Sequence, residues 1–461
     1  MNTKWRLRLL KIETFNKIQE KNNILAFFPI FIPILIEQFF QTLIGNVDIL
    51  LLSQYSDDGV AAVGIANQII VIGSMILSIV SIGTLILLSQ LCGASNIYKT
   101  KLVIKNSIYL NLAISFGLFI FLIVFGETFL KLIQTPKNLN EYANTYIKIV
   151  GFSLIFQSIM TSFATVFRSF TYVKYIMNIS IIVNILNIIG SGLVVLTPIT
   201  ILGKGVEGVA NATLISRVIG ASIYVYLFAR VFEDYFIDIL KVKLDFSSIK
   251  SIFKLGLPSG MESISYNVSQ TLLTSIIAGF GSVAVTSKIY AQTMTSYVFM
   301  ISSAISLAIQ VIIGRLIGSD LKEKASKYGC DVLYKGVSGV FLISLILALL
   351  SKNLVGIFTD NKSIVTLVIN LVFLSVLLEP ARAANCILIA GLNSAGDVKF
   401  PVAVGIIVTY IITVPMSYII GIKLGYGIQG IWFVSIVDEW IRATIFYLRW
   451  KKGNWKNIDI I

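Results

Sequence analysis

Residues 106–126 of this 461-residue chain read NSIYLNLAISFGLFIFLIVFG, and none of these side chains carries a charge. An α-helix needs about 20 apolar residues to cross the hydrocarbon core of a bilayer. The whole chain shares this character, since 56% of its residues are hydrophobic, only 13% are charged and the mean hydropathy is +0.87. A soluble fold cannot cover so much apolar surface with so few charges. The sequence therefore predicts an all-α membrane protein with many spans.

Comparable apolar stretches recur to the end of the chain. At roughly 38 residues for one span and its loop, the chain accommodates about twelve spans. The expected spans are residues 24–53, 59–91, 103–126, 141–170, 174–198, 205–230, 248–279, 283–317, 329–351, 363–391, 398–423 and 427–450. No cleavable signal peptide is expected before them, because the basic residues ahead of Ile24 are too spread for one.

The basic residues fix the expected orientation. Most of the 37 Lys and Arg fall in the N-terminal segment, after the even-numbered spans and in the C-terminal segment. Short loops rich in Lys and Arg stay in the cytoplasm, so both termini are expected on the cytoplasmic side of the plasma membrane. The net charge of +14 then results from the Lys and Arg residues of the segments expected on the cytoplasmic side. The bilayer is an expected partner, and nucleic acid is not.

Composition excludes several classes of chemistry. The chain has no histidine, which removes Ser-His-Asp and Cys-His nucleophile pairs and histidine-ligated metals. Its cysteines, Cys92, Cys330 and Cys386, lie far apart, so a disulfide framework or a metal cluster is not expected. We therefore expect neither an enzyme nor a bound cofactor.

The two halves of the sequence repeat each other at an offset of about 225 residues. Pro33-Ile-Leu-Ile-Glu37 aligns with Pro258-Ser-Gly-Met-Glu262, and Tyr172-Val-Lys174 aligns with Asp397-Val-Lys399. Six spans per half is an even number, so the halves share one orientation, as in transporters with parallel repeats. The sequence predicts an N-lobe at residues 1–235 and a C-lobe at 236–461, with a binding site between or within them.

Glu37 and Asp48 share one face of the first span and lie roughly 16 Å apart along the helix. An ionisable group within a span costs about 2.5–3.5 kcal/mol on the insertion scale, so each needs an explanation. Asp48, in a partly dry cavity, could exchange a proton, Na⁺ or a cationic substrate, or it is simply solvated at the outer interface. Glu37 either faces a cleft or bonds to a neighbouring helix, and Pro33 beneath both can bend the helix.

Polar residues in later spans are further candidates. Asn184, Asn187 and Ser191 of the fifth span either join helices or line the same cavity as Asp48. The residues expected to line a substrate cleft are Glu37, Gln38, Gln68, Glu262, Tyr266, Asn267, Gln270, Gln292, Glu379 and Arg382.

Acid–base clusters in the C-terminal half allow pairing within one helix. Glu379 and Arg382 are three residues apart, and Arg442 follows Asp438 and Glu439 at spacings of four and three, which places each cluster on one helix face. Such clusters are either structural pairs or substrate and gating residues. A Glu262–Lys288 pair between spans is also geometrically possible.

In their order along the chain, several motifs resemble the multidrug and toxic compound extrusion (MATE) family of cation-coupled antiporters. They are Pro33-x-x-x-Glu37-Gln38 with Val47-Asp48, Gly59-Val-Ala-Ala-Val-Gly64-Ile-Ala-Asn67-Gln68, Gly205-Val-Glu-Gly208, Gly256-Leu-Pro258 and Gly391-Leu-Asn393-Ser-Ala-Gly396-Asp397. The resemblance implies a V-shaped pair of six-helix lobes that exports organic cations or other amphiphiles in exchange for H⁺ or Na⁺. It also implies that Asp48 binds the ion, with Asn187 nearby.

Three positions depart from the patterns of that family. Ser191 stands where many members have an acid, Tyr266 where one subgroup has a glutamate, and Arg382 where that subgroup has an aspartate. The resemblance therefore implies an N-lobe ion site with a single carboxylate. The acidic C-lobe ion site is expected to be absent, or rebuilt around Glu379 and Glu262.

The resulting hypothesis is a monomeric antiporter in which an ion bound at Asp48 rearranges the first span around Pro33 and lowers the affinity for cargo. Linkage then requires that cargo weakens ion binding equally. The alternatives are a lipid-linked oligosaccharide flippase of related architecture, an intramembrane enzyme and a channel. A flippase would favour a strongly basic cavity, whereas the cavity candidates here are mixed in sign.

Overall fold

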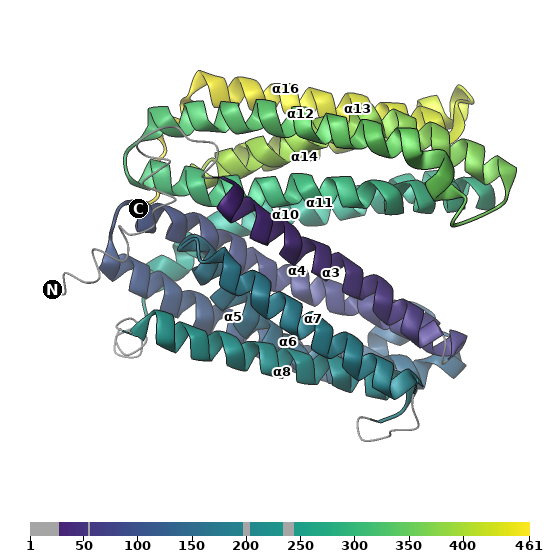
Figure 1. Cartoon of the computed structure of the whole chain (residues 1–461), viewed down its shortest axis with the longest axis horizontal. Coiled ribbons are helices and arrows are strands. Elements are labelled where there is room, and N and C mark those ends of the chain that lie inside the picture. The colour runs from purple at the N-terminus through teal and green to yellow at the C-terminus, as the bar shows by residue number, and fades with distance from the viewer. Residues whose placement is uncertain (1–26, 54–55, 197–202, 234–243) are drawn as a thin grey trace. The chain divides into compact units, whose positions relative to one another are not determined.

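The computed structural model describes residues 27–53, 56–196, 203–233 and 244–461, and within these ranges the regular elements are all helices (Figure 1). The helices of the first half are α3 (Phe28–Ser53), α4 (Asp57–Gly93), α5 (Ile97–Leu132), α6 (Lys137–Ser169), α7 (Val173–Leu196) and α8 (Gly205–Val231). Those of the second half are α10 (Phe246–Ala278), α11 (Ser282–Gly318), α12 (Lys322–Val355), α13 (Lys362–Ser394), α14 (Lys399–Ile407), α15 (Val414–Tyr418) and α16 (Gly427–Lys452). Short π-helical segments flank α15.

The predicted all-α architecture of twelve spans is confirmed, with α14, α15 and their π segments forming one continuous rod. Within the described ranges, nine helices are long and apolar enough to cross a membrane by length and composition. The remaining three are α3, α10 and α16. Polar residues such as serine, asparagine and glutamine lower the hydropathy of α10, and the charged cluster Asp438–Glu439–Arg442 lowers that of α16. Helix α3 has a shorter apolar stretch at Phe28–Leu43.

The helix ends differ from the predicted spans. The span expected at 103–126 is a helix from Ile97 to Leu132, and the span expected at 329–351 runs from Lys322 to Val355. Hydropathy marks only the part of a helix that lies in hydrocarbon, whereas backbone hydrogen bonding continues into water. Asn96 illustrates this at the start of α5, since its side chain accepts a hydrogen bond from the Lys99 backbone as an N-cap.

The eleventh span has π-helical segments at Val408–Thr413 and Ile419–Lys423 that the sequence did not predict. The Thr413 hydroxyl donates to the Val408 carbonyl five residues earlier, at 3.3 Å. Pro415 follows this segment directly. Because proline has no backbone N–H, the ordinary helical ladder is interrupted here, and wider turns are one way to absorb the interruption.

The described chain divides into two compact units. One, the N unit, comprises Ile32–Cys92 and Asn96–Leu257; the other, the C unit, comprises the residues up to Phe31, Gly93–Ser95 and Pro258–Ile461. The first helix of each repeat therefore changes unit along its length, α3 between Phe31 and Ile32 and α10 between Leu257 and Pro258. The lobe boundary at residue 235 stays a prediction.

The N unit has an apolar core formed by α3, α4, α5, α6 and α8. Leu52, Ile70, Leu122, Leu154 and Val209 represent these five helices in it. Beside the core, α5 and α6 are joined by polar contacts: the Asn111 amide donates to the Ser162 hydroxyl at 2.8 Å, and the hydroxyls of Ser115 and Ser158 lie 3.0 Å apart. Buried polar pairs of this kind join helices in membranes.

The start of α10 is tied to the N unit by Asp245. Its carboxylate accepts hydrogen bonds from the backbone N–H and the hydroxyl of Ser248 at 2.9 and 2.6 Å, so it caps the helix. These bonds, above all that from the Ser248 hydroxyl, hold the pKa of Asp245 below its usual value. The buried Asn106 of α5 donates to the Asp245 carbonyl at 2.9 Å, which fixes this end of α10 against α5.

Two glycines bring α4 and α10 into backbone contact within the N unit. A Cβ atom at Gly83 would overlap the carbonyl oxygen of Ile252, and one at Gly256 would overlap that of Ile79. Small residues permit such close crossing of membrane helices. The crossing therefore depends on the absence of a side chain at both positions.

We expect Gly83→Ala to lower the free energy of unfolding by about 1–3 kcal/mol, because the added methyl group forces the helices apart. Gly117→Ala in α5 is the matched control, since a Cβ there meets nothing within 4 Å, and it should gain up to about 1 kcal/mol in helix propensity. Thermal unfolding in detergent measures both. Equal stability of the two variants would contradict the close crossing.

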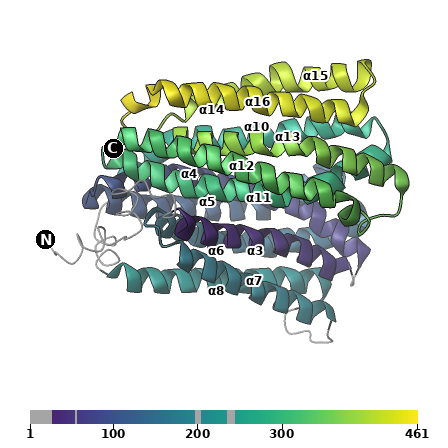
Figure 2. The same cartoon turned by 45° about the horizontal axis from the view of Figure 1, so that its top comes forward.

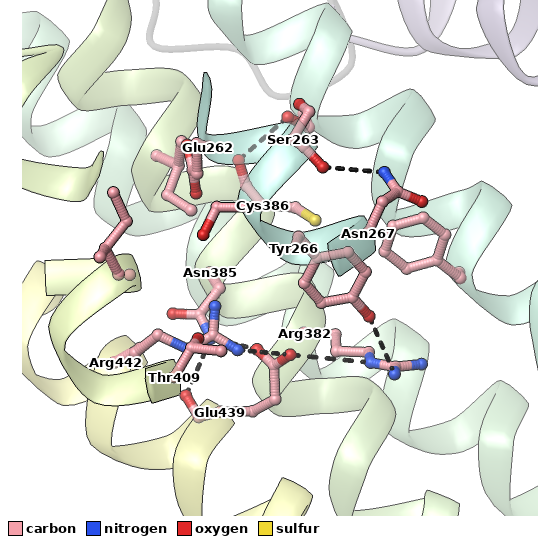
Figure 3. A pocket seen from close by; sticks show the side chains of 16 residues that line it. Glu262, Ser263, Tyr266, Asn267, Arg382, Asn385, Cys386, Thr409, Glu439 and Arg442 are labelled. Carbon is pink, nitrogen blue, oxygen red and sulfur yellow. Dashed lines mark hydrogen bonds and ion pairs between the residues drawn. The ribbon is translucent and has the colours of Figure 1, made fainter. Parts of the chain in front are cut away.

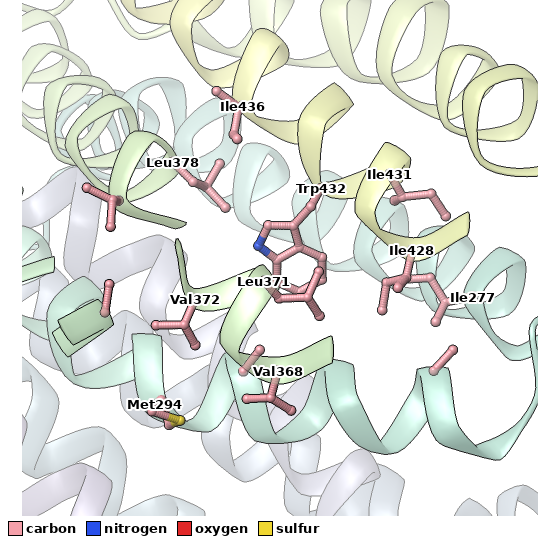
Figure 4. Close-up of a cluster of buried hydrophobic side chains, with 14 of the residues drawn as sticks. Ile277, Met294, Val368, Leu371, Val372, Leu378, Ile428, Ile431, Trp432 and Ile436 are labelled. Carbon is pink, nitrogen blue, oxygen red and sulfur yellow. The ribbon is translucent and has the colours of Figure 1, made fainter. Parts of the chain in front are cut away.

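The C unit has its own core, in which Trp432 of α16 is central (Figure 4). The Trp432 indole N–H donates to the Ser375 hydroxyl of α13 at 3.0 Å. Leu371 and Val368 of α13 and Ile277 of α10 belong to the same buried cluster. In this unit α14 and α16 run side by side (Figure 2). The core thus holds α10, α13 and α16 beside the cavity described next, and α14 contacts α16.

Candidate functional site

The N unit holds a cavity of about 330 Å³ that is lined by polar residues of α7 and α8. Asn184 and Asn187 both line it, and the Asn187 amide donates to the Thr213 hydroxyl of α8 at 3.1 Å. Ser191 lies on the same helix face and is fully buried, but it is not among the lining residues. Of the three α7 candidates, the structure therefore brings two together at one cavity.

Several polar residues of this cavity were not predicted as site residues, among them Arg217 and Asn67. Arg217 of α8 lines it, and its guanidinium donates to the Ser153 hydroxyl of α6 at 2.6 Å. Asn67 of α4 lines it beside Gly64, within the motif that carried the family resemblance. That motif, rather than any charge pattern, is the signal that could have identified Asn67.

Asp48 belongs to α3, but its side chain lies outside the described part of the chain. The helix itself is continuous from Phe28 to Ser53, with Pro33 inside it. Leu52, one turn after position 48, lines the cavity with Asn184 and Asn187.

Glu37 is paired across the N unit. Its two carboxylate oxygens each accept a hydrogen bond from the same guanidinium nitrogen of Arg168 in α6, at 2.8 Å, and the Gln41 amide donates to it at 3.3 Å. Glu37 is buried and lines neither cavity described in this section. Its geometry is that of a bond to a neighbouring helix. Gln38 is half-buried and Gln68 exposed, and neither lines a described cavity.

The C unit holds a larger cavity, of about 470 Å³, between α10, α11, α13, α14 and α16 (Figure 3). Its charged lining residues are Glu262, Arg382, Glu439 and Arg442. The polar and apolar lining residues are Ser263, Ser265, Tyr266, Asn267, Phe299, Ser306, Asn385, Cys386, Ile389, Gly405, Ile406 and Thr409. Four charges against a wall with several apolar residues suit a ligand that is itself amphiphilic.

Arg382 connects α13 to α10 and α16. It pairs with Glu379 at 3.0 Å, donates to the Tyr266 hydroxyl at 3.2 Å and lies 3.8 Å from Glu439. Glu379 is fully buried. The predicted pairing of Glu379 with Arg382 is thus found, and Tyr266 joins it from the position where a family subgroup has an acid.

Arg442 holds the second acidic cluster. It pairs with Asp438 at 2.6 Å and with Glu439 at 2.8 Å, all within α16. The Asn385 amide of α13 donates to the other Glu439 oxygen at 2.6 Å and to the Glu439 carbonyl at 2.8 Å. Glu439 therefore contacts both arginines, and it unites two clusters that the sequence presented as separate.

Glu262 is the lining carboxylate without an ion pair among the described residues. The possible pair with Lys288 is not formed: Lys288 donates instead to the Thr274 hydroxyl of α10. The repeat offset relates Glu262 to Glu37 and relates Arg168, the partner of Glu37, to Asn393. The C-terminal half thus lacks the arginine that neutralises this glutamate in the N-terminal half.

The cavity also borders several buried polar atoms without a hydrogen bond in the described chain. They include Nε of Arg442, Oδ1 of Asn385 and Oδ1 of Asp438. Asn267 lines the cavity with Glu262 and Tyr266, whereas Gln270 and Gln292 do not. With all groups ionised, four carboxylates face two guanidinium groups, so the cluster carries a net negative charge. No group of acidic or cysteine side chains suited to a metal ion occurs in the described ranges.

Comparison with known proteins identifies the family. The MatE family model matches residues 33–193 and 258–419, and these segments begin 225 residues apart, which is the offset of the sequence repeat. The uncharacterized transporter YisQ of Bacillus subtilis (strain 168) is 34% identical over 429 residues, covering 92% of this chain and 93% of that protein. The probable multidrug resistance protein NorM of Thermotoga maritima is 24% identical, covering 93% of this chain and 92% of that protein.

Solved structures share the fold. A crystal structure of MATE in the bent conformation has a TM-score of 0.86 at 18% identity and covers 95% of this chain and 97% of its own. An outward-facing multidrug resistance MATE transporter has a TM-score of 0.84 at 18% identity, covering 97% of each chain. The chain is thus a multi-pass membrane protein that belongs to the MatE family, whose members are efflux transporters with a twelve-helix fold rather than enzymes.

Proposed function

We propose that this protein is a secondary active antiporter that exports amphiphilic or cationic small molecules in exchange for H⁺ or Na⁺. The observation that carries this proposal is the match of the family model to both halves of the chain. Each half also encloses a polar cavity within its own unit. Separate sites for the ion and for cargo permit coupled exchange when occupancy of one site lowers the affinity of the other.

The N-unit cavity is the proposed ion site. Asn184 and Asn187 supply amide oxygens, and α3, the helix that carries Asp48, contributes Leu52 to the same cavity. A carboxylate with amide oxygens is a suitable ligand set for a hard cation such as Na⁺, and a carboxylate alone can carry a proton. The coupling ion is the expected small ligand of this site, and no further cofactor is proposed.

The C-unit cavity is the proposed cargo site. Glu262 offers a carboxylate that forms no ion pair among the described residues, while Phe299, Ile389 and Ile406 offer apolar contact. An organic cation with an apolar body satisfies both. The net negative charge of the cluster also argues against the strongly basic cavity expected of a lipid-linked oligosaccharide flippase.

Exchange would proceed by rocking alternating access, in a monomer with both termini on the cytoplasmic side of the plasma membrane. Ion binding at Asp48 would rearrange α3 around Pro33 and lower the affinity for cargo. By linkage, cargo bound from the cytoplasm lowers the affinity for the ion by the same factor. The orientation rests on basic residues at helix ends, which include Lys99 at the start of α5, Arg230 at the end of α8, Lys322 at the start of α12 and Lys451 at the end of α16.

The test is transport in proteoliposomes with one gradient imposed at a time. A fluorescent cationic dye should move against its own gradient when either ΔpH or ΔNa⁺ is imposed, but not with both absent. A gradient of K⁺ of equal size is the control. Dye movement that is equal under all conditions would contradict coupled exchange, and flipping of labelled lipid without dye transport would favour the flippase.

A further inference from the structure

A narrow apolar groove of about 290 Å³ lies on the C unit, between the start of α3 and helices α11 and α12. Phe28 and Phe31 line it from α3, Ile305 from α11 and Ile343 from α12. One lining residue is charged, Lys335 of α12. The groove therefore combines an apolar channel with a single cationic group, and it is separate from both polar cavities.

Lys335 stands at the level of a lipid headgroup. No charged residue separates it from Lys352 on α12, and at 1.5 Å per residue this interval spans about 25 Å. The hydrocarbon core of a bilayer is about 30 Å thick, so the two ammonium groups reach opposite headgroup regions when the long side chains extend outward. Lys335 is exposed and has no hydrogen bond or ion pair among the described residues.

The groove extends from Lys335 toward the centre of the membrane. Gly336, Gly339 and Ile343 of α12 line it in turn, over about 12 Å of helix. A Cβ atom at Gly339 would meet nothing within 4 Å, so the open space here results from a missing side chain. Phe28 on the opposite wall is 48% exposed, which leaves its ring available for contact with a guest.

We propose that this groove is a binding site for an anionic phospholipid, with the phosphate at Lys335 and one acyl chain along Gly339 and Ile343. Lys322, Lys324 and Lys327 precede Lys335 on α12, so a lipid headgroup would reach Lys335 from the basic end of this helix. Anionic lipids concentrate in the cytoplasmic leaflet and attract such basic segments. A cationic drug does not suit the groove, because its only charged group is also a cation. Binding here would hold the first turn of α3 on α12.

The first test measures lipid retention by the purified protein with native mass spectrometry, using phosphatidylglycerol and phosphatidylcholine. The protein should retain phosphatidylglycerol preferentially. Lys335→Gln should lower the affinity for phosphatidylglycerol about fivefold, the effect of one basic residue near an anionic headgroup. Lys352→Gln, at the other end of the same apolar interval, should change it much less. Unchanged preference in Lys335→Gln, or an equal loss in both variants, would overturn the proposal.

The second test locates the acyl chain. Phosphatidylglycerol with a photoreactive group in mid-chain should label α12 between Lys335 and Ile343 and the start of α3. Gly339→Leu should remove this labelling by filling the groove, while Gly117→Leu, at another open glycine, should leave it unchanged. Labelling that persists in Gly339→Leu overturns the proposal. The proposal is also overturned if the lipid labels nothing and cross-links show that another segment of this chain, or of a second copy, occupies the groove.

Discussion

Asp48→Asn should abolish the gradient-driven export of a cationic dye, a loss of at least about tenfold. Coupling free energies of about 1–3 kcal/mol correspond to factors of about 5–150, and the substitution removes the one carboxylate proposed for the ion site. An amide cannot carry the exchanged proton and gives Na⁺ a neutral ligand. The described lining of the proposed ion site, which includes Asn184 and Asn187, holds no carboxylate, so none of these residues could replace it.

The measurement is dye efflux from proteoliposomes under ΔpH and, separately, under ΔNa⁺. Asp360→Asn is the matched control, because this acid lies exposed between α12 and α13 and should leave export unchanged. Dye binding without a gradient should survive in Asp48→Asn, since cargo is assigned to the other cavity. If efflux of Asp48→Asn still follows the imposed gradient at the normal rate, the ion site lies elsewhere.

Arg442→Gln should be the most destabilising single substitution in the C unit, with a loss of about 3–5 kcal/mol in the free energy of unfolding. Arg442 is 6% exposed, and it neutralises two carboxylates that are each 5% exposed, Asp438 and Glu439. Removing the guanidinium group leaves both buried carboxylates without its positive charge in surroundings of low polarity. Arg382, at 3.8 Å from Glu439, compensates only one of them weakly.

Thermal unfolding in detergent tests this expectation. Glu323→Gln is the control, because it removes an ion pair with Lys456 whose glutamate is 86% exposed, and such surface pairs contribute at most about 1 kcal/mol. The double variant Asp438→Asn with Arg442→Gln should recover part of the loss, since one of the two uncompensated charges is gone. Equal melting temperatures of Arg442→Gln and Glu323→Gln would show that the cluster does not need its arginine.

The helical architecture could be predicted because each span is a long apolar run with its own local signal. The helix ends could not, since the helices continue beyond the hydrocarbon that hydropathy detects. The π turns before Pro415 could not be predicted from the sequence for a different reason. A proline inside a span predicts an interruption, but neighbouring helices decide whether a kink or a wider turn results.

The candidate site shows the same limit. Pairs within one helix, such as Glu379 with Arg382, follow from spacing and are found in the structure. Contacts between helices do not follow from spacing, as the Glu37–Arg168 pair shows. Likewise, only the packing of α13 against α16 reveals that Glu439 unites the two acid–base clusters. Glu262 lacks the arginine partner that Glu37 has, and this becomes visible only when the sequence repeat is combined with the observed contact between Glu37 and Arg168.

The change of unit along α3 has a consequence for biosynthesis. The first turn of α3 lines one groove with Ile301 and Ile305 of α11, which leave the ribosome about 270 residues later, and with α12, which follows them. At about 5–20 residues per second, this turn waits roughly 15–50 s for its neighbours. The first turn of α3 can therefore reach its place only after α11 and α12 have been translated, whereas the residues of the N unit are all present once Leu257 has been added.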